Sequence, residues 1–175
     1  MRKAVLVRPA GCDDLDQLLC LFTEVAAERI WIGTQPGFDQ EAYRSRWTRV
    51  IEEKSGMLIV ASEDDALVGT LSIDLDSEHG CEIGMLVKSE HRGKGIGTAL
   101  LREAIRWARQ RNETSLCLLV FPHNAAAIAL YERHGFEKKR RIEAFKKRQN
   151  GEIWDVILMV LPLSIRQEAD VSQAF

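Results

Sequence analysis

The sequence predicts a mixed α/β fold, with a central twisted sheet of about six to seven strands flanked by about four helices. Two patterns lead to this prediction. Continuous or alternating apolar segments are followed by segments with apolar residues at three- and four-residue steps, which indicates strands and then helices. A three-strand meander precedes strands that alternate with helices, so we expect a mixed sheet rather than a doubly wound parallel one.

The N-terminal part of the chain is expected to form one strand and two helices. These elements are a strand at residues 5–7, a helix at 15–26, a loop at 30–38 and a helix at 39–54. The strand should stop at Pro9, because proline cannot donate to a ladder. Asp13 or Asp14 can cap the first helix. The loop mixes Gly and Pro with apolar residues, so we expect it to shape a pocket.

The remaining chain alternates between the two periodicities. The expected elements are strands at 57–61, 67–75 and 81–87, a helix at 95–111, a strand at 116–121, a helix at 124–134, and strands at 136–142 and 153–161. Turn residues at 63–65 and at Asn150-Gly151 indicate hairpins. No repeat or linker-like shift in composition divides the chain. Residues 1–163 are therefore expected to form a single domain, and residues 164–175 a polar tail.

Composition and charge exclude several classes of protein. The 175 residues are 46% hydrophobic and 29% charged, which is ordinary for a folded domain. The net charge of −2 argues against nucleic-acid or membrane binding driven by bulk charge. The charge is uneven, with 8 Lys and Arg against 15 Asp and Glu in residues 1–80, and 16 against 11 afterwards. An anionic ligand should therefore prefer the second half.

The cysteines indicate neither a disulfide framework nor a metal site. They show no C-x-x-C pair and no histidine at zinc-ligand spacing. The apolar segment near the N-terminus is too short for the core of a signal peptide. No apolar run approaches the roughly 18 residues of a membrane span. We therefore expect reduced thiols and a cytoplasmic protein.

The segment at residues 91–101 has the features of an anion site. Gly93, Gly95 and Gly97 follow an expected strand and open an expected helix, so uncovered backbone N–H groups meet the positive end of the helix. Arg92 and Lys94 add positive charge. The dinucleotide and P-loop spacings both fail here, although a nucleotide-binding domain remains an alternative. A phosphate or pyrophosphate is the expected ligand.

The same residues match R-x-x-G-x-G in a strand-turn-helix setting, and here the sequence resembles the GNAT superfamily of N-acyltransferases. The resemblance implies a GNAT-like fold, with acetyl-CoA as cosubstrate. It also implies that the strand before the turn splays from its neighbour, leaving backbone groups free for the pantetheine arm. The cofactor-binding residues it implies are Met85, Leu86, Val87, Arg92, Gly93, Lys94, Gly95, Ile96, Gly97, Thr98 and Asn124.

Residues 124–136 are similar to a second GNAT signature, N-x-x-A-x-x-L-Y-x-x-x-G-F. Asn124 is a good N-cap residue and Gly135 a good helix stop. At about 100° per residue, Asn124 and Tyr131 share one helical stripe. The resemblance implies that Asn124 binds pantetheine and that Tyr131 lies beside the thioester sulfur, where its phenol acts as general acid. A half-buried core tyrosine is the alternative.

The acceptor amine must be neutral to attack, so a base is expected. Glu82 is the candidate, because GNAT enzymes often place a catalytic carboxylate on this strand. A polar residue at the exposed end of the strand, or a water relay, is the alternative. The resemblance implies direct acetyl transfer in a ternary complex, without a covalent intermediate.

The acceptor is expected to be a small amine or an amino acid. Trp31, Phe38 and Trp47 lie in an acidic region and favour a small cationic or aromatic acceptor. A protein N-terminal or lysine acetyltransferase and a non-catalytic acyl-CoA sensor are the alternatives. The basic run between residues 136 and 151 lacks aromatic interleaving beyond Phe145, so a solvated strand pair is expected, with an acidic substrate or partner as the alternative. We expect no nucleic-acid or membrane partner, and a homodimer remains open.

Overall fold

The computed structural model describes residues 4–77 and 79–163. Within them, one sheet contains seven strands in the order β1-β2-β3-β4-β5-β7-β6. The strands are β1 (Leu6–Pro9), β2 (Gly56–Glu63), β3 (Ala66–Ser77), β4 (Gly80–Val87), β5 (Ser115–Val120), β6 (Glu137–Lys147) and β7 (Ile153–Pro162). The helices are α1 (Leu15–Ala27), α2 (Gln40–Glu53), α3 (Ile96–Gln110) and α4 (Ala125–Arg133), with short 3₁₀ turns η1 (Cys12–Asp14) and η2 (Ser89–His91). The predicted mixed α/β fold is confirmed.

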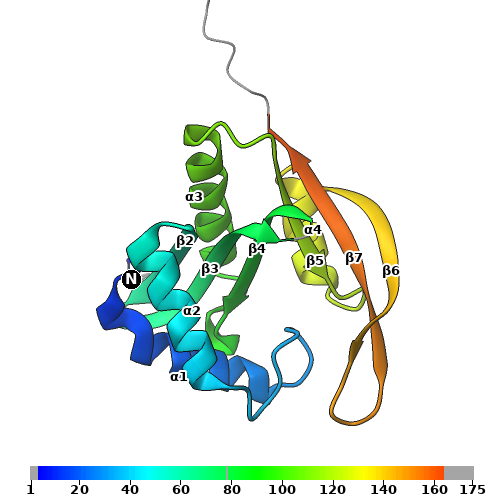
Figure 1. The fold of residues 1–175 in the computed structure, drawn as a ribbon, viewed down its shortest axis with the longest axis horizontal. Coiled ribbons are helices and arrows are strands. Elements are labelled where there is room, and N and C mark those ends of the chain that lie inside the picture. The colour runs from blue at the N-terminus through cyan, green and yellow to red at the C-terminus, as the bar shows by residue number, and fades with distance from the viewer. Residues whose placement is uncertain (1–3, 78, 164–175) are drawn as a thin grey trace, which may run out of the picture.

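The sheet consists of two antiparallel parts that meet at one parallel pair of strands (Figure 1). Strands β1 to β4 are antiparallel neighbours, as are β5, β7 and β6. Between β4 and β5, the described residues have only Glu82 and Cys117 in register. The two strands diverge beyond this pair, so the sheet is open at its centre.

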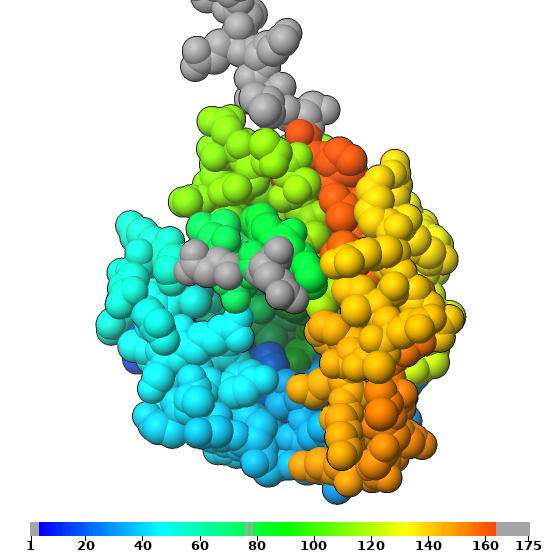
Figure 2. Space-filling model, turned by 45° about the vertical axis from the view of Figure 1, so that its right-hand side comes forward, coloured from blue at the N-terminus to red at the C-terminus, as the bar shows by residue number. Residues whose placement is uncertain are grey.

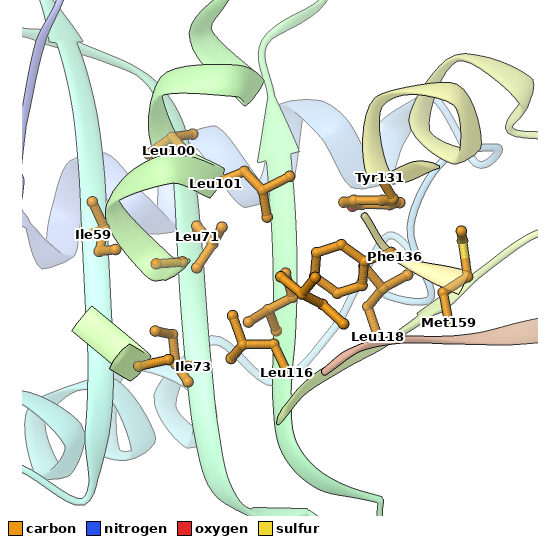
Figure 3. Close-up of a cluster of buried hydrophobic side chains, with 14 of the residues drawn as sticks. Ile59, Leu71, Ile73, Leu100, Leu101, Leu116, Leu118, Tyr131, Phe136 and Met159 are labelled. Carbon is orange, nitrogen blue, oxygen red and sulfur yellow. The ribbon is translucent and has the colours of Figure 1, made fainter. Parts of the chain in front are cut away.

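Helices cover both faces of the sheet and hold its two parts in place. Helices α1 and α2 pack on one face, where Leu18, Trp47 and Val60 are buried. Helices α3 and α4 pack on the other face, in a cluster that includes Leu100 and Tyr131 (Figure 3). Each fully buried side chain of this size contributes about 1.5–3 kcal/mol. The central opening therefore lies in a well-packed scaffold.

Two local expectations about the N-terminal part were wrong. Strand β1 runs two residues past the predicted end at residue 7 and ends at Pro9, which is tolerated because β1 lies at the edge of the sheet and pairs only with β2. Asp14 does not cap α1 with its side chain. Its carboxylate accepts hydrogen bonds from the Arg8 guanidinium at 2.7 and 2.8 Å, which lower the pKa of Asp14. The second helix, expected to begin at Asp39, begins one residue later and is capped by Asp39, which accepts from the Ala42 N–H at 3.0 Å.

Strands β6 and β7 form a long arm at the other edge of the sheet. Strand β6 is five residues longer at its C-terminal end than predicted and is exposed along most of its length. Ion pairs from β6 to neighbouring elements include Lys138 with Glu132 at 2.9 Å and Arg141 with Asp155 at 2.7 Å. The part of the basic run within β6 is therefore solvated, as expected, whereas Arg148 beyond it is buried. The polar tail predicted for residues 164–175 lies outside the described residues.

Candidate active site

A cavity of about 1300 Å³ occupies the opening between β4 and β5. Its walls come from the loop after α1, helix α2, strands β3 and β4, the turn before α3, the end of β5, and α4. Figure 2 shows the hollow between the cyan surface of α2 and the orange surface of the β6–β7 arm. The predicted loop at residues 30–38 does line a pocket, through Trp31, Ile32, Gly33 and Thr34.

The glycine-rich turn forms a cradle of backbone donors at one end of this cavity. Gly93 and Gly95 have φ values of +72° and +89°, in the left-handed region that favours glycine. Helix α3 begins at Ile96, and the Ala99 N–H donates to the Gly95 carbonyl at 3.0 Å. The N–H groups before Ala99, including those of Ile96, Gly97 and Thr98, precede the first intrahelical bond. Free donors at a helix start fit a diphosphate.

Gly97 has an ordinary helical backbone, and its lack of a side chain leaves room for side chains of α4 and β4. A Cβ at this position would lie 3.0 Å from Leu130 Cδ2 and 3.5 Å from Met85 Cε. The Ile96 side chain is buried in the core, so only its backbone is available to a ligand at the turn. Thr98 is half-buried and lines the cavity.

The two basic residues of the turn have different surroundings. Arg92 donates two hydrogen bonds to the Glu28 carboxylate, at 2.6 and 2.7 Å, and a third to the Val87 carbonyl at 2.9 Å. Its guanidinium carbon lies 5.7 Å from the ring centroid of Trp31. This pairing lowers the pKa of Glu28 and neutralises the charge that the sequence suggested was free. Lys94 is exposed and has no ion pair among the described residues.

The other predicted pantetheine contacts are partly engaged within the chain. The Val87 carbonyl already accepts from Arg92, while the Leu86 side chain is buried in the cluster beneath α1. Met85 is half-buried and lines the cavity. The Asn124 Oδ1 caps α4 by accepting from the Ala127 N–H at 3.2 Å. The side-chain NH₂ of Asn124 remains as a donor at the cavity wall.

Tyr131 belongs both to the core and to the cavity wall. Its ring centroid lies 5.7 Å from that of Phe136, and the residue is 6% exposed (Figure 3). Its hydroxyl has no hydrogen-bond partner among the described residues. Burial raises the pKa of the phenol to about 12. The hydroxyl is therefore protonated at neutral pH, as a proton donor must be.

Glu82 lies where β4 and β5 begin to diverge. Its Oε2 accepts a hydrogen bond from the Ser77 hydroxyl at 2.5 Å, and it lines the cavity. In the strand pairing, Glu82 lies opposite Asp74 of β3 on one side and Cys117 of β5 on the other. Asp74 forms an ion pair with Arg46 of α2. Burial, with a smaller effect of Glu82, raises the pKa of Cys117 to about 11, so this thiol stays protonated and is a poor nucleophile.

Several contacts around the site had no signal in the sequence. Glu28, Asp74 and Ser77 are ordinary polar residues whose partners are set by packing. Arg148 was only part of a basic run, yet it is buried. The described residues contain no group of three or more side chains suited to hold a metal ion, and none of their helices has the length and apolarity needed to cross a bilayer.

Free backbone donors at a helix start, an opening between two diverging strands and a buried phenol are the features expected of a CoA-dependent N-acyltransferase. The family comparison agrees with this class. The model of the Acetyltransferase (GNAT) family matches residues 21–136, and the chain belongs to that family. It is therefore an N-acetyltransferase whose acetyl donor is acetyl-CoA.

Similar proteins have acceptors of more than one kind. L-amino acid N-acetyltransferase AaaT of Escherichia coli is 33% identical over 123 residues, covering 65% of this chain and 73% of that protein. An uncharacterized N-acetyltransferase of Methanocaldococcus jannaschii is 28% identical over 156 residues, 82% of this chain but 65% of the relative's length. The crystal structure of a ribosomal-protein-alanine N-acetyltransferase from Brucella melitensis has a TM-score of 0.81 at 29% identity, covering 90% and 99% of the two chains.

Proposed function

We propose that this protein transfers the acetyl group of acetyl-CoA to the primary amine of a small acceptor, by direct attack in a ternary complex. The observation that supports this most strongly is the cavity, in which the diphosphate cradle, Tyr131 and Glu82 line one continuous space. Acetyl-CoA supplies an activated thioester carbonyl. The residues of the chain bind it, orient it and move two protons.

The proposed cofactor site follows the cavity wall. The N–H groups of residues 93–98 and the Lys94 ammonium hold the diphosphate, and the Asn124 NH₂ with backbone groups of Met85, Leu86 and Val87 holds the pantetheine. Arg92 contributes through the turn that it braces against Glu28, rather than as a free charge. The cradle lies in the second half of the chain, where Lys and Arg outnumber Asp and Glu, and this excess of positive charge suits a polyanionic ligand.

Tyr131 is proposed as the general acid that protonates the departing sulfur. A phenol with a pKa of about 12 is a weak acid beside a thiol in water, whose pKa is about 8.5. Burial reduces this mismatch, because desolvation raises the pKa of a thiol, as it does at Cys117. A desolvated thiolate near Tyr131 would be comparably basic, so proton transfer would be nearly balanced.

Glu82 is proposed as the base that accepts a proton from the acceptor ammonium. The Ser77 hydroxyl orients one of its oxygens, and Arg46 neutralises the neighbouring Asp74. The Glu82 carboxylate has no ion pair among the described residues and lies where β4 and β5 diverge, so it can receive the amine there. A bound water between Glu82 and the amine would serve the same purpose.

The acceptor is proposed to be an amino acid or a similar small amine. The cavity wall on this side presents acidic Glu82 and Asp74 from the sheet, and Arg46 and Arg49 from α2. Arg49 has no ion pair among the described residues. Groups of both signs match a zwitterion, with its ammonium toward Glu82 and its carboxylate toward Arg49. The name of the E. coli relative, an L-amino acid N-acetyltransferase, supports this choice.

A two-part experiment tests the proposal. First, calorimetric titration with desulfo-CoA should show saturable binding, and a blank titration at millimolar ligand would contradict the cofactor site. Second, release of the CoA thiol should be followed across a panel of L-amino acids, simple amines and a short peptide beginning with alanine. Release with at least one free amino acid or simple amine is expected. Binding without release across the panel would favour the acyl-CoA sensor instead.

A further inference from the structure

Arg148 is a buried cation that the proposed chemistry does not use. It follows the end of β6, at the tip of the β6–β7 arm, and is 4% exposed. No carboxylate lies within ion-pair distance of it in the described part of the chain. A buried guanidinium without a counter-ion is costly unless its N–H groups find other acceptors.

Those acceptors lie in the loop between α1 and α2. The guanidinium donates to the carbonyl of Arg29 at 2.9 Å, to that of Ile32 at 3.1 Å and, more weakly, to that of Gly33 at 3.4 Å. Arg29 has a φ of +59°, a left-handed conformation that costs a residue with a side chain about 1–2 kcal/mol. One side chain from the arm therefore holds three carbonyls of a bent loop.

Aromatic rings and the neighbouring Gln149 add to this junction, the contact between the tip of the β6–β7 arm and the loop between α1 and α2. The Arg148 guanidinium carbon lies 4.4 Å from the ring centroid of Trp154 and 5.9 Å from that of Phe121, within the range of cation–π attraction. The Gln149 N–H donates to Gln35 Oε1 at 2.7 Å, and Gln149 Nε2 donates to the Pro36 carbonyl at 2.8 Å. The contact with the arm therefore extends over most of the loop.

The position of this junction determines what can reach the cavity. Trp31 to Thr34, which lie within the held loop, line the cavity wall. The loop and the tip of the arm are joined by hydrogen bonds, so this side of the cavity is bridged. A small molecule needs only the hollow between α2 and the arm that Figure 2 shows.

We propose that Arg148 and Gln149 form a clasp that fixes loop 29–36 against the β6–β7 arm and thereby restricts the acceptor to small amines. The proposal rests on the proposed acetyl transfer and assigns its acceptor selectivity to residues outside the reacting centre. Arg148 is a positioning residue in this scheme, because it acts through the loop.

The test compares three variants of the full chain with the wild type. Arg148→Met keeps the unbranched stem and removes the guanidinium. Gln149→Ala removes the side-chain hydrogen bond to the Pro36 carbonyl, keeps the backbone hydrogen bond to Gln35, and leaves the buried cation in place. Arg140→Met is the matched control, because Arg140 is exposed on β6 and has no ion pair among the described residues. Each protein is assayed by thiol release with the best small amine of the panel and with a short alanine-initiated peptide.

The wild type should strongly prefer the small amine. In Arg148→Met, the ratio of kcat/KM for the amine to kcat/KM for the peptide should fall by about tenfold or more, through a raised amine KM, while the acetyl-CoA KM stays unchanged. Gln149→Ala should show a smaller change in the same direction, and Arg140→Met none. Trypsin should cleave after Arg29 faster in both clasp variants than in the wild type.

Each other outcome has a definite meaning. An unchanged ratio in a folded Arg148→Met protein would overturn the clasp, and so would a wild type that acetylates the peptide as well as the amine. If Arg148→Met does not fold, the ratio and cleavage rate of Gln149→Ala decide, and unchanged values there also overturn the clasp. A wild type that transfers to neither acceptor would contradict the proposed function, and equal trypsin rates would then reject the clasp separately.

Discussion

Replacing Tyr131 with phenylalanine removes one oxygen atom from the proposed general acid and changes little else. The ring packs beside Phe136 and is 6% exposed, so the apolar contacts remain. The hydroxyl has no hydrogen-bond partner among the described residues, so its removal leaves no other group unpaired. We therefore expect the free energy of unfolding to change by less than about 1 kcal/mol.

The turnover number should respond very differently. General acid catalysis contributes typically 10²–10⁴-fold, so kcat should fall by about that factor, or about 2.7–5.4 kcal/mol in activation free energy. The affinity for desulfo-CoA should stay the same, because that ligand lacks the sulfur. Thiol release at saturating substrates measures kcat, and urea unfolding measures stability.

The pH dependence gives a further check. With a pKa of about 12, the phenol remains protonated over the usual assay range, so its ionisation should reduce wild-type activity only above about pH 11. The same deletion at Tyr43, whose hydroxyl lies 2.8 Å from that of Thr34, serves as a matched comparison and should leave kcat within a few-fold. Wild-type turnover in a folded Tyr131→Phe protein would refute the role of the phenol.

Three other substitutions test separate parts of the site. Glu82→Gln should lower kcat about 10²-fold or more at neutral pH and recover at high pH, where the amine is already neutral, and an unchanged pH–rate profile would place the base elsewhere. Gly95→Ala should cost about 1–2 kcal/mol in urea unfolding, since φ is +89° and the added Cβ meets no atom within 4 Å; equal stability would disprove that strain. Glu28→Gln should destabilise the protein at pH 7. Because Arg92 lowers the folded-state pKa of Glu28, the stabilisation exists above the ordinary carboxyl pKa of about 4.3 and disappears as pH falls through the lowered value. A wild-type advantage that persists well below that pH in acid titrations would contradict this linkage.

The elements of the fold were largely predictable, because local residues encode them. The apolar periodicity predicted the strands and helices to within a few residues at most ends, and the helix expected from residue 39 begins at Gln40. The predictions failed where residues elsewhere in the chain compete for the same hydrogen-bonding groups. Asp14 accepts from Arg8 and from the Gly11 N–H instead of capping α1, and β6 continues past residue 142 because β7 pairs with it.

The motifs of the candidate site were also visible in the sequence. The glycines that adopt positive φ, the helix start after them and the Asn124 cap are properties of a few consecutive residues. Such features follow from backbone sterics and local hydrogen bonding. The glycine spacing was therefore enough to predict an anion cradle and the family that carries it.

By itself, then, the sequence determined the order of elements, the cradle at the start of α3 and the tyrosine on α4. Only the tertiary structure decided which charged side chains are paired or buried within the protein and which remain available to a ligand. Arg92, which the motif suggested as a phosphate ligand, is paired with Glu28, 64 residues away in the chain. Arg148, unremarkable in a basic run, is buried against a loop more than 100 residues earlier. Backbone conformation is encoded locally, whereas the partner of a side chain depends on how distant segments pack.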